Sequence, residues 1–214
     1  MSTNNLLPFG KHYLIVESVF TNGMKITIRL RPLAKGYAVL AHFQFNTGTR
    51  VGEACALDWQ DIDLNAGLVR ISKSVQWARG KNRTTVISEL TKTGKTRVIP
   101  LLDMVKDILV KWQTYSRRAT GLVFSQNGFK LLEYRSVQYR YDKSFKAVGL
   151  NASASHILRH SFSTDFQLKT QDQFALSKIL GHKNLKQTEH YAKITNETMQ
   201  IGLRSYNEAL QEKE

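Results

Sequence analysis

The stretch Thr47-Gly-Thr-Arg-Val-Gly-Glu53 joins two helical patterns and carries an arginine at their junction. The apolar run at 33–45 predicts a largely buried helix that ends near Gly48. Residues 51–57 predict a short helix that starts directly after Arg50. Because the helix dipole is positive at that end, an arginine there makes sense if an anion binds between its guanidinium and the free helix N–H groups.

Glu53 lies one turn beyond Arg50 and could hold the guanidinium in position. The competing interpretation is an ion pair on the protein surface, which would contribute little to stability.

Upstream of this junction, residues 13–31 predict a β-hairpin, although the apolar residues of its first half also fit a helix: Leu14, Val16, Val19 and Phe20. Asn22-Gly23 is a strong turn signal, and Ile26, Ile28 and Leu30 alternate with polar residues. Downstream, residues 67–100 predict a small antiparallel sheet, with strands at 68–71, 75–77, 84–87 and 97–100.

Helical periodicity dominates from Asp103 onward. One face of the first helix there is apolar and comprises Val105, Ile108, Leu109 and Trp112. Further helices are predicted at 134–148, 158–168, 173–180 and 196–211. The sequence therefore predicts one α+β unit that is mostly α.

The charge of the chain indicates a polyanionic partner. Lys and Arg total 31 against 17 Asp and Glu, a formal net charge of +14. The excess is local, because residues 70–97 carry eight basic residues and one acid, whereas residues 151–214 carry eight basic residues and seven acids. Such clustering is expected of a groove that follows a phosphate backbone.

Composition also narrows the class of protein. The single cysteine, Cys55, allows no intramolecular disulfide, which fits a reducing compartment. No apolar run approaches the ~20 residues needed to span a bilayer, and the N-terminus lacks the plan of a signal peptide. We therefore expect a cytoplasmic protein with no membrane partner, associated with the nucleoid when it binds DNA.

Three further motifs carry groups suited to phosphate chemistry. Thr91-Lys-Thr-Gly-Lys-Thr-Arg97 places lysines on a turn, although a solvated charge run is an equally good interpretation of that segment alone. His156-Ile-Leu-Arg-His160 places a titratable ring and a bidentate cation on one helix face. Leu180-Gly-His182 ends a helix, and Tyr191 follows nine residues later.

A metal site is a poor interpretation of these motifs. His156 and His160 have the i, i+4 spacing of a zinc pair, but no glutamate lies between them and no third ligand is apparent. We expect no metal and no other cofactor.

Together the four segments resemble the catalytic domain of the tyrosine recombinase (phage integrase) family. The family's signature is a Thr-Gly-x-Arg turn, a hairpin lysine, His-x-x-Arg, Leu-Gly-His and a tyrosine about nine residues on. All are present here, in order, between Thr47 and Ile194. The resemblance implies a helical catalytic fold with a small antiparallel three-stranded sheet.

The resemblance also implies the role of each residue. Arg50 and Arg159 would bind the non-bridging phosphate oxygens, and His182 would donate a hydrogen bond to the phosphate. Tyr191 would attack the phosphorus and form a 3′-phosphotyrosyl link, with His156 as general base. Lys92 would be the general acid, with Lys95 as the alternative, and His160 would be structural rather than catalytic.

The resemblance further implies site-specific recombination or integration of double-stranded DNA by a protein that is monomeric alone and a homotetramer on DNA. Integration by a mobile element is favoured on family frequency, and a phage, a transposon and a chromosomal resolution system all stay open. We expect DNA contacts from the basic residues between and beside the motifs, namely Lys73, Arg79, Lys81, Arg83, Lys95, Arg97 and Lys183. The alternatives are a DNA-binding regulator that has lost activity, a type IB topoisomerase that nicks and closes strands, and a telomere resolvase.

The resemblance suggests three parts of the chain. Residues 33–195 form the catalytic domain, and residues 1–32 form an N-terminal extension that could belong to it. Only 49 residues precede Arg50, too few for the separate N-terminal DNA-clamping domain of the family, so we expect either a fragment or a minimal member. Residues 196–214 form a tail helix whose apolar face, Met199, Leu203, Tyr206 and Leu210, packs on its own core or on a neighbouring subunit.

Overall fold

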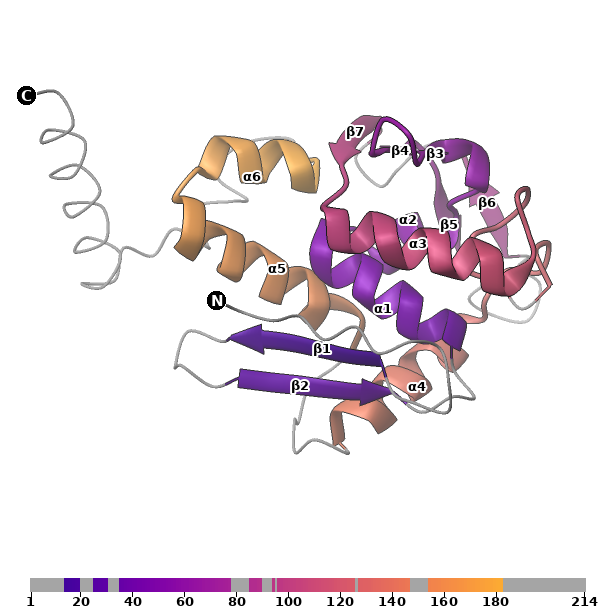
Figure 1. Cartoon of the computed structure of the whole chain (residues 1–214), viewed down its shortest axis with the longest axis horizontal. Coiled ribbons are helices and arrows are strands. Elements are labelled where there is room, and N and C mark those ends of the chain that lie inside the picture. The colour runs from indigo at the N-terminus through magenta and orange to yellow at the C-terminus, as the bar shows by residue number, and fades with distance from the viewer. Residues whose placement is uncertain are drawn as a thin grey trace, which may run out of the picture.

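A computed structural model describes residues 14–19, 25–30, 35–77, 85–89, 94, 96–125, 127–146 and 154–182. Within these ranges, helices surround a central helix, a β-hairpin lies on one side and small sheets lie on the other (Figure 1). No helix of this described part is long and apolar enough to cross a membrane.

The predicted N-terminal hairpin is confirmed. Strand β1, Leu14–Val19, pairs antiparallel with β2, Lys25–Leu30, in a register that sets Leu14 opposite Leu30. The hairpin lies against α1 and α4, the helices at 35–47 and 134–146 (Figure 1).

Helix α1, Lys35–Thr47, is the centre of the molecule and contacts α2, α3, α4 and α5. Its apolar side chains face in several directions, as expected of a helix surrounded by protein, and both Leu40 and Phe43 are 0% exposed. Helix α3, Asp103–Ser116, instead has one apolar face. That face is buried and consists of Val105, Ile108, Leu109 and Trp112, as the sequence predicts.

The predicted sheet is confirmed as a small antiparallel arrangement, but its strands are distributed differently. Strands β4, Leu68–Ile71, and β7, Arg97–Pro100, pair with each other, and the third strand of this sheet is β3, Ile62–Asp63. The other two predicted strands form a separate pair, β5, Ser74–Gln76, with β6, Val86–Ser88. A two-residue strand such as β3 is too short to produce an alternating pattern.

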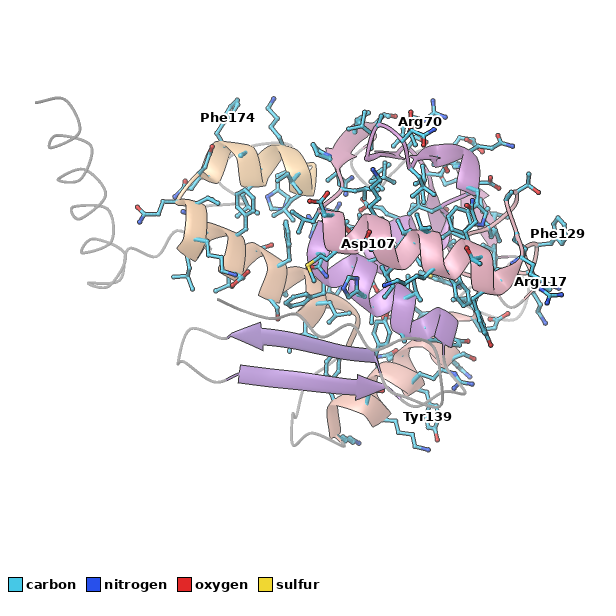
Figure 2. The ribbon with its side chains drawn as sticks, viewed as in Figure 1. Arg70, Asp107, Arg117, Phe129, Tyr139 and Phe174 are labelled. Atoms are coloured by element: carbon cyan, nitrogen blue, oxygen red, sulfur yellow. The ribbon has the colours of Figure 1, made fainter. Side chains whose placement is uncertain are left out.

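The remaining helices are α2, Val51–Cys55, the 3₁₀ turn η2, Trp59–Asp61, α4, Tyr134–Lys146, α5, Ala154–Thr170, and α6, Gln173–Leu180. Helix α5 begins four residues earlier than the predicted 158, so His156 lies in its first turn. Side chains on the outer faces of these helices point to solvent, as Phe174 of α6 and Tyr139 of α4 do in Figure 2. The predicted helix at 196–211, and with it the tail, lies outside the described residues.

Candidate active site

The turn between α1 and α2 is fixed by buried polar contacts. Thr47 Oγ1 donates to the carbonyl of Phe43 at 2.7 Å and lies 3.0 Å from Thr49 Oγ1. Gly48 has φ +62°, and a Cβ there would lie 2.5 Å from Cδ1 of Phe162. Only glycine therefore fits between α1 and α5 in this conformation, and the turn delivers Arg50 to the start of α2.

Arg50 is anchored by Glu53. Its backbone N–H donates to Glu53 Oε2 at 2.9 Å and its Nη1 donates to Oε1 at 3.0 Å. The Glu53 side chain is 0% exposed and that of Arg50 is 21% exposed. The ion pair of Arg50 and Glu53 is therefore partly buried and differs from an exposed surface pair. The prediction that Glu53 holds the Arg50 guanidinium is confirmed.

Arg97 is a second partner of the same carboxylate. Its Nη2 donates to Glu53 Oε2 at 2.8 Å and its Nη1 to Oε1 at 3.3 Å. Burial alone would raise the pKa of Glu53, but the hydrogen bond and charge of Arg97, together with Arg50, lower it below its usual value. Glu53 is therefore an anion shared by two arginines.

The prediction that Arg97 contacts DNA is not favoured by this geometry. Its side chain is only 8% exposed, and its guanidinium is engaged inside the protein. The alternating pattern of a strand indicates which face a side chain lies on, but it carries no information about a partner 44 residues away.

Arg159 of α5 joins the two ends of the site. Its Nη1 donates to the carbonyl of Gly48 at 2.7 Å, and its Nη2 donates to the carbonyl of Leu180 at 3.0 Å. The same Nη2 lies 3.1 Å from Nε2 of His182. The charges of Arg50 and Arg159 both act on the ring of His182, so these three residues, which are widely separated in the sequence, lie near one another.

The C-terminus of α6 presents His182. Gly181 adopts φ +67°, and the N–H groups of Gly181 and His182 bond back to the carbonyls of Lys178 and Ser177 at 3.1 Å each, which is a Schellman motif. Among the described residues, the next two carbonyls have no helical partner, and each accepts from an arginine. Arg97 Nε donates to Ile179 at 2.7 Å, and Arg159 donates to Leu180.

The imidazole of His182 is neutral at physiological pH. Burial, followed by the positive charges of Arg159, Arg50 and Arg97, lowers its pKa to about 4. Since an arginine only donates, Nε2 of His182 accepts in the contact with Arg159, and the ring proton belongs on Nδ1. The three guanidiniums and one carboxylate leave an excess of two positive charges around this neutral ring, an arrangement suited to an anion.

His156 is on the same helix as Arg159. It lies three residues before Arg159 in the first turn of α5 and is exposed, whereas Arg159 is 5% exposed. His160 is also exposed, with its ring centroid 6.5 Å from that of His156. Within the described ranges, no group of three His, Cys, Asp or Glu side chains could hold a metal ion.

Lys73 lies at the small sheet, where its Nζ pairs with Asp61 Oδ2 at 2.8 Å. Arg70, which points outward from β4 in Figure 2, lies 3.7 Å from the same carboxyl group. The other predicted residues fall outside the described part of the chain, and their predicted roles are untested by it: Arg79, Lys81, Arg83, Lys92, Lys95, Lys183 and Tyr191.

Comparison with known proteins gives consistent matches. The sequence model of the Phage integrase family matches residues 21–198. The tyrosine recombinase XerC of Proteus mirabilis is 30% identical over 165 residues, which cover 75% of this chain and 48% of XerC. The chain thus spans about half the length of the curated relatives it matches.

Solved structures share the fold. The Tn1549 transposon integrase in complex with transposon right end DNA matches with a TM-score of 0.64 at 19% identity, covering 82% of this chain and 60% of that one. The catalytic domain of bacteriophage HP1 integrase matches with a TM-score of 0.53 at 19% identity, covering 78% of this chain and 80% of that one.

Proposed function

The chain belongs to the phage integrase family, and from this premise we propose that it cleaves and rejoins DNA strands through a 3′-phosphotyrosyl intermediate formed by Tyr191. The observation that carries the proposal is the convergence of Arg50, Arg159 and His182 at one positively charged place. Phosphoryl transfer needs fixed donors where charge develops on the phosphorus oxygens. Planar guanidiniums supply such donors in pairs.

The proposed reaction balances without an external energy source. The phenolic oxygen of Tyr191 attacks the phosphorus, and the bond from phosphorus to the 5′ oxygen breaks. His156 takes the phenolic proton, and Lys92 gives a proton to the departing 5′ oxygen. The phosphotyrosyl ester keeps the energy of the broken bond, so the reverse attack by a 5′-hydroxyl can rejoin strands without ATP.

Each donor in the described residues has a defined part in this scheme. Arg50 and Arg159 bind the non-bridging oxygens, and the proton on Nδ1 of His182 forms a hydrogen bond to the phosphate. A neutral histidine donates that hydrogen bond without adding charge to a cluster that already holds three guanidiniums. Arg50 and Arg159 hold the phosphate where a divalent metal would otherwise do so, so the scheme requires no metal ion.

The proposed substrate is double-stranded DNA in the cytoplasm, bound by a protein that is monomeric alone and tetrameric on DNA. The net charge of +14 supports a polyanionic substrate. No target sequence is proposed, because base readout depends on which side chains reach the base edges. The trapping experiment described next identifies that sequence.

A trapping experiment tests the proposal without knowledge of the target site. The full chain is incubated with a pool of duplexes of randomised sequence that carry 5′-bridging phosphorothiolates, whose cleavage releases a thiol that rejoins poorly. Covalent protein–DNA adducts are isolated under denaturing conditions and sequenced. Wild type should give adducts of a recurrent sequence, and Tyr191→Phe should give none.

The outcomes separate the alternatives. Adducts with Tyr191→Phe would refute the choice of nucleophile. Binding of selected duplexes without any wild-type adduct would favour a silent regulator. Relaxation of supercoiled plasmid, without strand exchange between two copies of the recovered site, would favour a type IB topoisomerase.

The same pool distinguishes Lys92 from Lys95 as general acid. A thiolate leaves without protonation, so an alanine variant of the general acid should cleave the phosphorothiolate and fail on the ordinary phosphodiester. We expect this pattern for Lys92→Ala and not for Lys95→Ala. The reverse pattern would transfer the role to Lys95.

A further inference from the structure

Arg97 contacts both structural elements that present the candidate active site. It lies on β7, yet its guanidinium reaches Glu53 of α2 and the carbonyl of Ile179 at the end of α6. These contacts span 44 and 82 residues of sequence. No other proposed role in the reaction uses this side chain.

The contact with α2 controls where Arg50 can lie. Both oxygens of Glu53 accept from Arg97, at 3.3 Å and 2.8 Å, and both also accept from Arg50, through the backbone N–H and Nη1. The carboxylate is fully buried, so it has no water to replace a lost donor. Moving Arg97 therefore moves the anchor of Arg50.

The contact with α6 controls where His182 can lie. Arg97 Nε donates to the carbonyl of Ile179, three residues before His182, at 2.7 Å. A Cβ on Gly181 would lie 3.1 Å from Arg97 Nη1 and 3.2 Å from its Cδ, so the glycine turn packs closely on the arginine stem. The cation also faces the negative end of the α6 dipole.

We propose that Arg97 is a positioning residue that holds the Glu53–Arg50 pair in register with the turn that presents His182. The inference rests on the function proposed above, in which Arg50 and His182 contact the same phosphate. Since misplacement of reacting groups by about 1 Å can slow an enzyme by about a hundredfold, a residue that fixes their spacing affects the rate without touching DNA.

An arginine suits this position because its donors point in fixed, separate directions. Nε reaches Ile179 while the two terminal nitrogens reach Glu53. A lysine keeps the positive charge but has one nitrogen, so it can hold the carboxylate or the carbonyl and not both in this geometry. Arg97→Lys therefore separates positioning from charge.

The test compares Arg97→Lys with wild type in two measurements. The first is the single-turnover rate of adduct formation on a duplex recovered from the trapping pool, together with the dissociation constant for that duplex. The second is the titration of the His182 ring by NMR in the protein without DNA, assigned with His182→Asn. Arg118→Lys is the matched control, because Arg118 also donates to a backbone carbonyl, that of Ser125 at 3.0 Å, on a different part of the molecule.

We expect Arg97→Lys to form adduct on the order of tenfold or more slowly at saturating DNA, with a dissociation constant within about threefold of wild type. We also expect the His182 titration midpoint to rise from about 4 toward 6.5, because the loosened turn admits water and weakens the contact with Arg159. Arg118→Lys should match wild type in all three quantities.

Three results would overturn the inference. A wild-type rate in Arg97→Lys would show that charge alone suffices. A rate loss matched by an equal loss of DNA affinity would make Arg97 a DNA contact. A slow variant with an unchanged His182 titration would remove the link to α6. If wild type itself forms no adduct, the proposed reaction fails, while the His182 titration still tests whether Arg97 fixes the turn.

Discussion

Acid should destabilise the protein through His42, a buried histidine on α1. The side chain is 2% exposed, and its Nδ1 has no hydrogen-bond partner among the described residues. Burial lowers its pKa from 6.5 to about 4. Between pH 6.5 and pH 4, His42 therefore binds a proton in the unfolded chain but not in the folded protein. The stability due to neutral His42 is present above pH 6.5 and is lost as the pH falls toward 4.

The size of the effect follows from the two pKa values. At pH 7 both states are mostly neutral at this position, so His42 changes the free energy of unfolding little. At pH 5 the histidine of the unfolded chain is almost fully protonated, whereas the folded histidine is mostly neutral. The linkage relation then gives a loss of about 2 kcal/mol between pH 7 and pH 5.

Urea unfolding of wild type and His42→Met at both pH values measures this quantity. Met is of similar size and does not titrate. The loss between pH 7 and pH 5 should be about 2 kcal/mol smaller in the variant. Other acid-sensitive groups, such as Glu53 and His182, are present in both proteins and cancel in the comparison.

Leu40→Met provides the control, since this buried substitution on the same helix removes no titrating group and should leave the pH dependence close to that of wild type. Equal losses in wild type and His42→Met would refute the reasoning, because they would mean that His42 takes up its proton as readily in the folded protein as in the unfolded chain.

Three further outcomes can be checked on the full chain. In urea titrations, Gly48→Ala should lower the free energy of unfolding by at least about 2 kcal/mol more than Gly67→Ala lowers it. Both glycines have φ above +60°, but of the two only the Cβ at Gly48 would meet protein atoms. Equal losses in the two variants would contradict this. The Cys55 thiol, whose pKa burial raises to about 12, should react with a colorimetric disulfide reagent only as fast as the protein unfolds. Tyr141→Phe removes the 2.8 Å hydrogen bond to Oε1 of Gln44 and should cost about 1–3 kcal/mol; a change below about 0.5 kcal/mol in urea would show that the amide finds another donor.

Features that repeat along the chain could be predicted from the sequence. The buried face of α3 follows from apolar residues at helical spacing, and the N-terminal hairpin follows from Asn22-Gly23 and the alternating segment after it. The pair of Arg50 and Glu53 is also local, one helical turn apart. In each case, the informative residues lie within one element or on the two sides of one turn.

Contacts between distant segments could not be predicted in this way. Arg97 has the sequence context of an exposed strand residue beside a basic turn, and only the folded chain brings Glu53 and Ile179 to it. The family resemblance predicts that Arg159 binds phosphate, but its contact with the Gly48 carbonyl spans 111 residues and leaves no pattern in the sequence.

The ion pairs within the protein alter how strongly its association with DNA should depend on salt. Each phosphate that a cation neutralises releases condensed counterions and steepens the logarithmic salt dependence by about 0.9. Lys73 already neutralises Asp61, and Arg50 and Arg97 share Glu53. A salt dependence calculated from the formal charge of +14 would therefore be steeper than the measured one. The measured slope reports how many cations of the protein are available to neutralise phosphates of the duplex.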